Sequence, residues 1–344
     1  MNASLPAVDA VLVLSFGGPE GPDDVIPFLE NVTRGRNVPR DRLEVVAQQY
    51  MLFGGRSPIN DECRGLVAAL ENELARRGPA LPVYWGNRNW QPMLADTVAQ
   101  MARDGIRRAV AVATSAYSSY SACRQYLEDI DRARGAAGPD APVIEKLAPY
   151  WNHPGFLETM IDNTRAAIAA NDGPGAAPRI VFTAHSLPAA MAAGCDYEAE
   201  LREASAIVAA AAAPDLAWDL VYQSRSGPPS QPWLGPDVCD HLRALRAGGV
   251  SRVVLVPIGF VADHMEVLYD LDTQAREVAD SVGITMTRAA CVGAAPRFVA
   301  GLVDVVVCHI EGRQPEFVGT RGPRPTPCAP GCCAYRPERP APVS

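Results

Sequence analysis

Eight short apolar runs alternate with amphipathic segments along this chain, and this alternation restricts its fold more than any other feature. Each run has the length and the Val, Ile and Leu content of a strand that is buried on both faces. The predicted strands cover residues 10–16, 81–86, 108–114 and 142–147, and then 179–184, 218–223, 252–258 and 284–287. Strands that alternate with helices form parallel sheets covered by helices. The sequence therefore predicts an α/β fold with two doubly wound Rossmann-like domains, each with a four-stranded parallel sheet flanked by helices.

The helical segments between these strands complete two similar halves. Helices are predicted at residues 23–32, 40–50, 61–78, 93–104 and 122–134, and then at 155–170, 197–212, 237–247, 264–281 and 296–311. A chain of 344 residues exceeds the size at which a single core stops growing. We expect an N-terminal domain over residues 1–150, a C-terminal domain over 151–295, a closing helix over 296–312 and a Pro/Cys-rich tail over 313–344. Without periodicity, the tail is predicted to be disordered unless something ties it down.

Composition excludes several classes of protein. The net charge of −8 and the pI near 5.2 argue against nucleic-acid binding, which needs a basic surface. The longest apolar runs, residues 204–214 and 253–262, are shorter than the roughly 20 residues that span a bilayer, so no transmembrane segment is expected. Residues 1–10 lack the basic and apolar pattern of a signal peptide, which favours a cytoplasmic protein. Nine cysteines, an odd number, make a disulfide framework unexpected in such a chain.

Two predicted strands lead into residues that can bind a metal ion. Residues 180–184 run directly into His185, and residues 253–258 lead through a short loop to Glu266. Because ligands of open α/β sheets bind outside the carboxyl ends of the strands, we expect these two side chains to form one site. An imidazole nitrogen and a carboxylate oxygen suit a first-row divalent metal such as Fe(II). The alternative is that His185 only packs or caps, as a single histidine at a strand end commonly does.

An acidic stripe follows on the predicted helix 264–281. Glu266, Asp270 and Gln274 are spaced at i, i+4 and i+8, so they share one face and could pass a cation inward. A solvated helix face would have the same pattern. His264 points elsewhere on the helix and is interpreted as structural.

Two further segments offer contacts for an anionic, aromatic ligand. Arg34, Arg36, Arg56 and the Ser57 hydroxyl lie in glycine-containing turns, where planar guanidinium groups could bind carboxylates. Residues 117–126 are rich in hydroxyls and aromatic rings, and could line a flat ligand. The alternatives are solvated arginines in the first segment, and helix capping with tyrosine packing in the second.

Seven motifs of this chain resemble those of ferrochelatases, in the same order over residues 10–311. They are LSFGGP at 14–19, RGR at 34–36, FGGRSP at 53–58, AHSLP at 184–188, YQSRSG at 222–227, PWLGPD at 232–237 and GFVADHMEVLYD at 259–270. The resemblance implies a chelatase-like fold that inserts Fe(II), its substrate, into a porphyrin held between two domains, without a nucleotide. It implies that His185 and Glu266 form the metal site and that Ser57 and Tyr126 hold the tetrapyrrole.

We hypothesise that His185, whose ordinary pKa is near 6.5, accepts a pyrrole proton. Glu266 would deliver and desolvate the metal, with Asp270 behind it on the delivery path. The chain departs from the family at two positions. Phe16 stands where some bacterial members carry a Tyr, and it has no oxygen to ligate iron. Gln274 stands where an acid often extends the metal path.

The tail cysteines resemble those that hold a [2Fe-2S] cluster in some ferrochelatases. By this likeness Cys123, Cys328, Cys332 and Cys333 supply the four thiolates that such a cluster needs. Adjacent cysteines at 332 and 333 depart from the more spread spacing of the family. The alternative is a flexible, oxidisable tail.

The tailed form and the LSFGGP opening look most like actinobacterial enzymes, which make coproheme from coproporphyrin III. The resemblance then implies downstream enzymes of heme biosynthesis as partners, and the four propionates of coproporphyrin would give the arginines more to bind. Protoporphyrin IX is the alternative substrate. Other readings are a cobalt or nickel chelatase and a non-catalytic haem or iron-sulfur binding protein.

Overall fold

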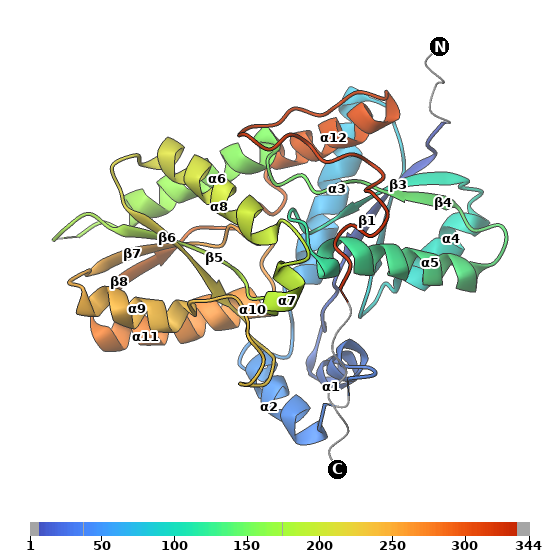
Figure 1. The fold of residues 1–344 in the computed structure, drawn as a ribbon. Coiled ribbons are helices and arrows are strands. Elements are labelled where there is room, and N and C mark those ends of the chain that lie inside the picture. The colour runs from blue at the N-terminus through green and yellow to red at the C-terminus, as the bar shows by residue number, and fades with distance from the viewer. Residues whose placement is uncertain (1–6, 37, 174, 336–344) are drawn as a thin grey trace.

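The computed structural model describes residues 7–36, 38–173 and 175–335, and its core consists of two four-stranded sheets (Figure 1). The strands are β1 (Ala10–Ser15), β2 (Val83–Asn87), β3 (Arg108–Ala113), β4 (Val143–Lys146), β5 (Arg179–His185), β6 (Trp218–Gln223), β7 (Arg252–Val256) and β8 (Thr285–Arg288). The first sheet has the order β2-β1-β3-β4 and the second the order β6-β5-β7-β8. All neighbouring strands are parallel. The predicted α/β fold with two four-stranded parallel sheets is confirmed.

Helices cover both sheets (Figure 1). The α-helices are α1 (Pro22–Val32), α2 (Arg40–Met51), α3 (Ile59–Arg77), α4 (Leu94–Arg103), α5 (Gln125–Ala137), α6 (Pro154–Ala170), α7 (Ala189–Ala192), α8 (Tyr197–Ala212), α9 (Val238–Ala247), α10 (Met265–Val267), α11 (Arg276–Val282) and α12 (Pro296–Ile310). None of the described helices is both long enough and apolar enough to cross a membrane.

Two predicted helices contain a stretch of π-helix. The segment predicted as one helix over 122–134 begins with the π-helix η1 (Tyr120–Arg124), and the segment 264–281 contains η2 (Leu268–Ala275) between α10 and α11. The prediction of a continuous α-helix is therefore wrong in these two stretches. A π-helix bonds residue i to i+5 and so widens the turn, and such stretches occur frequently at functional sites.

In each sheet the strand that comes first along the chain lies at an interior position, and this indicates where a ligand can bind. β1 lies between β2 and β3, and β5 lies between β6 and β7. The chain therefore changes direction beside β1 and beside β5, and crevices of doubly wound sheets open at such points, outside the carboxyl ends. His185 is the last residue of β5 and stands at one of these points.

One apolar cluster joins the two halves of the molecule. It contains Val13 of β1, Leu70 of α3, Phe182 of β5 and Phe298 of α12, all with at most 2% of their surface exposed. α12 packs against both α3 and α6, and so covers the junction (Figure 1). The division of the chain at residue 150 stays a prediction, because this shared core crosses it.

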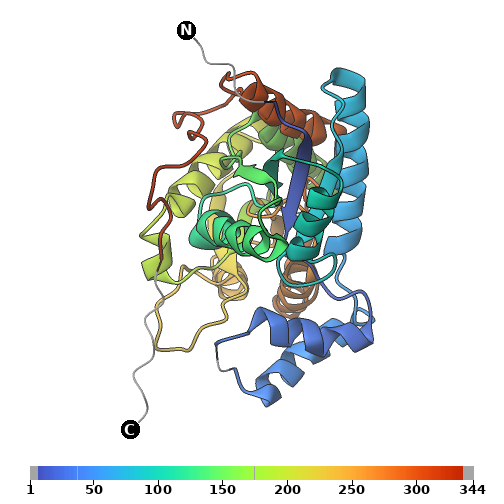
Figure 2. The same cartoon turned by 90° about the vertical axis from the view of Figure 1, so that its right-hand side faces the viewer.

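Helices α1 and α2 form a separate lobe below the first sheet (Figures 1 and 2). Phe28 of α1 and Tyr50 of α2 pack in a small apolar cluster of their own, and Met265 of α10 belongs to the same cluster. The lobe thus reaches across to the residue that precedes Glu266.

The tail after α12 is bound to the body of the protein as far as residue 335, where it lies beside α7 (Figures 1 and 2). The backbone N–H of Val318 donates to the carbonyl of Asn152 at 2.9 Å, and the Thr326 hydroxyl accepts from the N–H of Ala148 at 3.0 Å. Disorder was expected unless something tied the tail down, and these contacts do so for residues 313–335. Residues 336–344 lie outside the described part of the chain.

Candidate functional site

His185 and Glu266 meet at the carboxyl edge of the second sheet. β5 ends at His185, β7 is its parallel neighbour, and Glu266 lies in the short helix α10 that follows β7. The Nε2 atom of His185 is 3.4 Å from Oε2 of Glu266. The structure thus brings together the two side chains that the strand ends predicted as a pair.

Hydrogen bonds from three sides fix this pair. The Nδ1 atom of His185 lies 2.5 Å from the carbonyl oxygen of Ser186, to which it can donate, and this leaves Nε2 facing Glu266. The Tyr197 hydroxyl donates to the carbonyl of His185 at 3.0 Å. The Gln223 amide donates to the carbonyl of Glu266 at 3.0 Å. The backbone segments that carry the two side chains are therefore also fixed by hydrogen bonds.

A glycine allows β5 and the loop after β7 to approach closely. A Cβ atom on Gly259 would lie 2.6 Å from Cβ and 2.8 Å from Cα of Ala184, the residue before His185. Real Cβ atoms do not come this close to backbone, so any larger residue would push the loop that leads to Glu266 away from the histidine.

The two charges of the pair stabilise each other. Burial by itself would lower the pKa of His185, but the facing Glu266 carboxylate and the Ser186 carbonyl raise it to about 9. Desolvation would raise the pKa of Glu266, but the imidazolium lowers it to about 2. At neutral pH the pair is therefore an imidazolium and a carboxylate, and a proton occupies the nitrogen that a metal ion would need.

Asp270 stands behind the pair, beside a polar cavity of about 420 Å³. Burial and the charge on Glu266 raise the pKa of Asp270 to about 7, although the hydrogen bond from the Ser224 hydroxyl opposes the shift. The cavity lies between α9 and the η2–α11 segment, and its lining includes Asp237, Asp240, Asp270, Gln274 and Glu277. Asp270 and Gln274 thus face the same cavity even though η2 is a π-helix.

His264 has a structural role. It is the N-cap of α10, and its Nδ1 atom accepts a hydrogen bond from the N–H of Glu266 at 3.2 Å. Its ring packs edge to face with Phe260 at 5.1 Å between centroids. This capping sets the start of the helix that carries Glu266.

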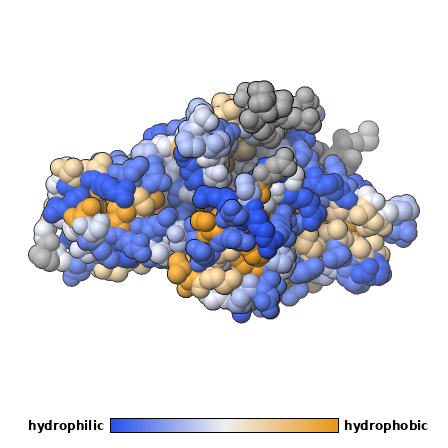
Figure 3. All heavy atoms as spheres, turned by 90° about the horizontal axis from the view of Figure 1, so that it is seen from below, coloured by the Kyte–Doolittle hydropathy of each residue, from blue (hydrophilic) through white to orange (hydrophobic). Residues whose placement is uncertain are grey.

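An aromatic surface faces the Glu266 turn from the other side. The rings of Phe16, Tyr50 and Trp90 each contact Phe28 edge to face, with centroids 6.0 to 6.2 Å apart. Burial and the charge on Glu266 both raise the pKa of Tyr50. Phe16 is 39% exposed, Val45 and Met51 of α2 are 47% and 46% exposed, and Figure 3 shows apolar patches among hydrophilic surface at this end of the molecule. The surroundings of the site thus combine a polar wall with an apolar one.

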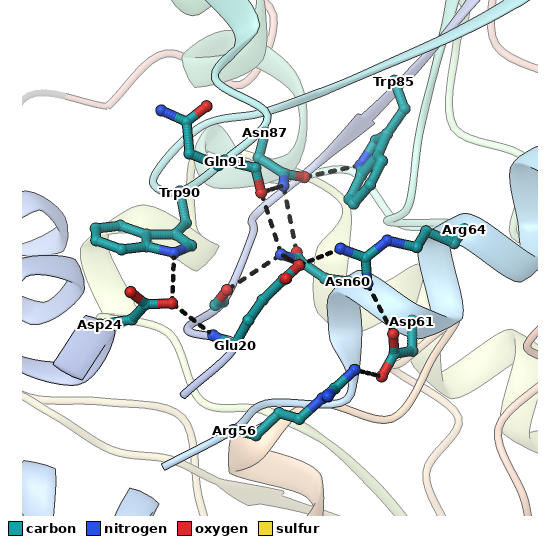
Figure 4. Close-up of polar contacts among 11 residues, drawn as sticks. Glu20, Asp24, Arg56, Asn60, Asp61, Arg64, Trp85, Asn87, Trp90 and Gln91 are labelled. Carbon is teal, nitrogen blue, oxygen red and sulfur yellow. Dashed lines mark hydrogen bonds and ion pairs between the residues drawn. The ribbon is translucent and has the colours of Figure 1, made fainter. Parts of the chain in front are cut away.

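A polar network fixes the carboxyl edge of the first sheet, and sequence reasoning missed its centre, Asn60 (Figure 4). The buried Asn60 amide donates to Oε1 of Glu20 at 2.8 Å and to the carbonyl of Gln91 at 3.1 Å. Its oxygen accepts from the Asn87 amide at 3.3 Å. One side chain of α3 thereby joins the loops that follow β1 and β2. No local sequence signal marks this residue.

The three predicted arginines are in different situations. Arg34 and Arg36 lie exposed in the turn after α1. Arg56 instead forms an ion pair with Asp61 (Figure 4). The positive charge of Arg56 already has a partner, with which a ligand carboxylate would compete, and its role as a carboxylate ligand stays a prediction.

Ser57 and Tyr126 are buried, with 3% and 4% of their surface exposed. Ser57 lies against Gly18. A Cβ atom added to Gly18 would lie 2.7 Å from the Cβ of Ser57. The guanidinium of Arg88 covers the Tyr126 ring at 3.9 Å from the centroid. Because both side chains are buried, a ligand would reach either hydroxyl only after neighbouring groups moved.

The four cysteines predicted to bind a cluster occupy one neighbourhood. The Sγ atoms of Cys332 and Cys333 are 3.6 Å apart, and Cys333 has a left-handed backbone with φ of 55°. A hydrogen bond with Cys333 lowers the pKa of Cys123 to about 6, with help from Lys146. Burial raises the pKa of Cys328, and so do the charges of Cys123 and Cys332. Four thiols beside a cation match a [2Fe-2S] cluster in number and kind.

These thiols do not yet surround a common centre. Across residues 7–36, 38–173 and 175–335, no three His, Cys, Asp or Glu side chains are arranged to hold a metal ion. The donor set therefore fits a cluster, whereas the positions of the thiols in the tail would have to close around it.

A second residue that sequence reasoning missed is Arg288, at the end of β8. Its guanidinium binds both oxygens of Asp263, at 3.0 and 3.1 Å, and both oxygens of Asp272, at 2.8 and 2.9 Å. Asp263 precedes Glu266 and Asp272 lies in η2. Arg288 thus clamps the segment that carries the acidic residues of the site from both ends.

The fold and this edge site define a chelatase-like α/β protein. SirB from Bacillus subtilis with Fe3+ has a similar fold, with a TM-score of 0.50 and 11% sequence identity, over 88% of this chain and 97% of that one. Residues 8–310 match the ferrochelatase family, and the chain belongs to that family.

Two relatives span nearly the whole chain. A ferrochelatase of Rhodopirellula baltica is 49% identical over 340 residues, which cover 98% of this chain and 97% of the relative. A coproporphyrin III ferrochelatase of Streptomyces coelicolor is also 49% identical, over 97% of this chain and 95% of the relative.

Proposed function

We propose that this protein inserts Fe(II) into coproporphyrin III to give coproheme. The observation that carries the proposal is the His185–Glu266 pair, 3.4 Å apart at the edge of the second sheet, in a chain of the ferrochelatase family. The name of the Streptomyces relative supports coproporphyrin III as the substrate. The reaction is proposed to occur in the cytoplasm, with downstream heme-pathway enzymes receiving the product.

Insertion must remove two pyrrole protons and strip water from the metal ion. We assign both protons to His185 in turn, after Fe(II) has reached Glu266, with the first released to solvent before the second is accepted. An arriving cation takes over the carboxylate and so removes the interaction that keeps the imidazole protonated. The pKa of His185 then falls, the proton leaves, and the neutral imidazole can accept a proton from the porphyrin. The pair thus becomes basic only when the metal is present.

Asp270 is proposed to deliver the metal and to exchange protons with solvent. Its pKa of about 7 allows both protonation states near neutral pH, and it borders the cavity of about 420 Å³. The carboxyl groups of Asp237 and Glu277 line the same cavity and favour the entry of a cation. Gln274 adds no charge, so the path relies on these neighbours.

The porphyrin is proposed to lie against the aromatic surface around Phe16, with its propionates toward exposed Arg34 and Arg36. Ser57 and Tyr126 remain proposed ligand contacts, reached once neighbouring groups move. Arg56 is proposed only as a secondary contact, because Asp61 competes for it.

We also propose that Cys123, Cys328, Cys332 and Cys333 hold a [2Fe-2S] cluster. A bound cluster would cross-link the tail to the loop that carries Cys123. The nearby positive charges of Lys146 and Arg324, which act on the thiol of Cys328, support an anionic cluster at this place. Protein purified under argon should be brown, with iron and labile sulfide in equal amounts. A colourless preparation that cannot be reconstituted would contradict the proposal.

The substrate is tested by following iron insertion into coproporphyrin III and into protoporphyrin IX through the change in visible absorbance. We expect faster turnover of coproporphyrin III, because it offers four carboxylates to the arginines rather than two. Replacing both Arg34 and Arg36 by Gln should reduce this preference. Faster turnover of protoporphyrin IX by the unaltered protein would reverse the assignment of substrate while leaving the metal chemistry in place.

A further inference from the structure

Glu200 is a buried carboxylate that joins the two halves of the protein. It lies in the first turn of α8 and has 1% of its surface exposed. Its Oε2 atom accepts hydrogen bonds from the backbone N–H and from the hydroxyl of Ser118, both at 2.8 Å. Ser118 is fully buried in the loop between β3 and η1. One side chain of the second half thus holds the loop that leads to the proposed porphyrin and cysteine residues of the first.

The counter-charge of Glu200 comes from the tail. The Nε atom of Arg324 donates to Oε1 of Glu200 at 2.9 Å, and the same guanidinium pairs with Asp196, the N-cap of α8. A buried carboxylate without a partner is costly. The match to the ferrochelatase family ends at residue 310. Arg324, which lies beyond the matched region, therefore neutralises Glu200, which lies within it.

The same turn of α8 contacts the metal site. Tyr197 lies three residues before Glu200, and its hydroxyl donates to the carbonyl of His185 at 3.0 Å. Its ring packs edge to face with Tyr117, the neighbour of Ser118, at 6.3 Å between centroids. The first turn of α8 is therefore in contact with His185, with the 117–118 loop and with the tail at once.

We propose that Glu200 is a positioning residue for His185, and that Arg324 holds it in place from the tail. Ser118 fixes the carboxylate relative to the first half, and Tyr197 on the same helical turn passes this placement to the His185 backbone. The inference rests on the proposed function, and it gives the tail a role at the metal site that is separate from binding a cluster. Loss of the link should change how the site receives the metal ion more than how the protein binds porphyrin.

The test uses the full-length protein with zinc as the metal and coproporphyrin III as the porphyrin. In Glu200→Gln an oxygen remains for Ser118, but the charge that binds Arg324 is lost. We expect the KM for zinc to rise about ten-fold, since small misplacements of reacting groups are costly, while the porphyrin Kd stays within about two-fold. Arg324→Gln should give the same change with the sequence of α8 intact. The double variant should be no worse than either single one, because both act on one link.

Glu203→Gln is the matched control. Glu203 lies one turn further along α8 and also binds the tail, since its carboxylate accepts from the Thr320 hydroxyl at 2.8 Å and pairs with Arg321 at 3.3 Å. It should therefore loosen the tail, seen as faster proteolysis after residue 312, and leave the KM for zinc unchanged. Iron and sulfide content is measured in every variant, so that an effect of cluster loss is recognised.

Two outcomes overturn the inference. One is an unchanged KM for zinc in Arg324→Gln, which remains decisive even if Glu200→Gln fails to fold. The other is an equal rise of the KM for zinc in Glu203→Gln. In that case any loosening of the tail would disturb the site, and Glu200 would have no specific role. In both of these outcomes the unaltered protein still inserts metal. If the proposed function were wrong, the unaltered protein itself would insert no metal, so the two failures can be told apart.

Discussion

The Nε2 atom of His185, the last residue of β5, faces the Oε2 atom of Glu266 at 3.4 Å, and Glu266 lies in the helix α10 that follows the neighbouring parallel strand β7. Their side chains are 32% and 49% exposed, so solvent and salt screen the pair and its contribution to folding is small. Its effect is on chemistry, because the proton on Nε2 must leave before this nitrogen can bind a metal ion or accept a pyrrole proton.

Zinc binding should therefore depend on pH in a defined direction. The facing carboxylate raises the pKa of His185 to about 9 from an ordinary value of 6.5, so the competing proton is present below this pKa and absent above it. Affinity for zinc should rise with pH up to about 9 and then level off. Calorimetry in buffers of different ionisation enthalpy should detect about one released proton at neutral pH. In Glu266→Gln the pKa of His185 should fall toward its ordinary value, so the pH range in which zinc binding releases a proton should move down with it. Equal zinc affinities of the unaltered protein on both sides of pH 7 would contradict the pairing.

His185→Ala distinguishes an enzyme from a carrier. Without the proton acceptor, turnover should fall by about a hundred-fold to ten-thousand-fold, while porphyrin binding, followed by fluorescence, stays close to that of the unaltered protein. His241→Ala is the control, since His241 of α9 pairs at 3.1 Å with Asp219 of β6, which lies beside Val181 and not beside His185. A carrier would have no turnover to lose, and equal losses in the two variants would indicate misfolding rather than chemistry.

Ser224 should tune the metal path through Asp270. Its hydroxyl donates to the Asp270 carboxylate and so stabilises the charged form, which holds down a pKa that burial raises to about 7. In Ser224→Ala this pKa should rise further, and the carboxylate should be less ionised at neutral pH. Metal insertion should slow by about three-fold at pH 7 and recover at higher pH, where Asp270 is ionised again. A loss that is the same at every pH would argue against this role.

The strands and the meeting of His185 with Glu266 could be predicted because both follow from general rules. Buried parallel strands are apolar runs, and their carboxyl ends share an edge. The π-helix η2 could not be predicted, since its side chains have the same hydrophobic pattern as an α-helix. Asn60 and Arg288 could not be predicted either, because a hydrogen-bonding hub depends on partners such as Gly18 and Asp263 that lie 42 and 25 residues away.

The tail illustrates the same limit. Its proline and glycine content predicts disorder, since it offers no periodic apolar face. What orders residues 313–335 is a set of polar groups on α8 and around Asn152, such as Glu203, which binds Thr320 from 117 residues away. Composition alone cannot reveal such partners.

Serine substitutions test the proposed cluster ligands. Removing any of the four thiolates, for example with Cys328→Ser, should abolish the iron and labile sulfide of protein purified under argon, because each thiolate fills a coordination position. Cys195→Ser is the matched control. Its thiol lies close enough for the charge on Cys123 to raise its pKa, but it is bonded to carbonyls of α7. If Cys195→Ser lost the cluster and Cys328→Ser kept it, Cys195 and not Cys328 would be the ligand.

Arg288 should contribute to stability as well as to the shape of the site. It is 14% exposed and is shared by Asp263 and Asp272, which are 26% and 32% exposed. Arg288→Met leaves two carboxylates close together without a cation, so the free energy of unfolding should fall by about 2 kcal/mol, less than for a fully buried pair. Urea denaturation measures this change.

The control for this prediction is Arg297→Met, which removes an arginine of α12 that is 51% exposed and pairs with Asp162. Its cost should stay below about 1 kcal/mol because solvent screens the pair. Since Arg288 also holds the two ends of the segment that carries Glu266 and Asp270, Arg288→Met should slow zinc insertion even at temperatures where the variant is fully folded. A variant with lower stability but unchanged insertion would mean that the loop after β7 keeps its shape without the clamp.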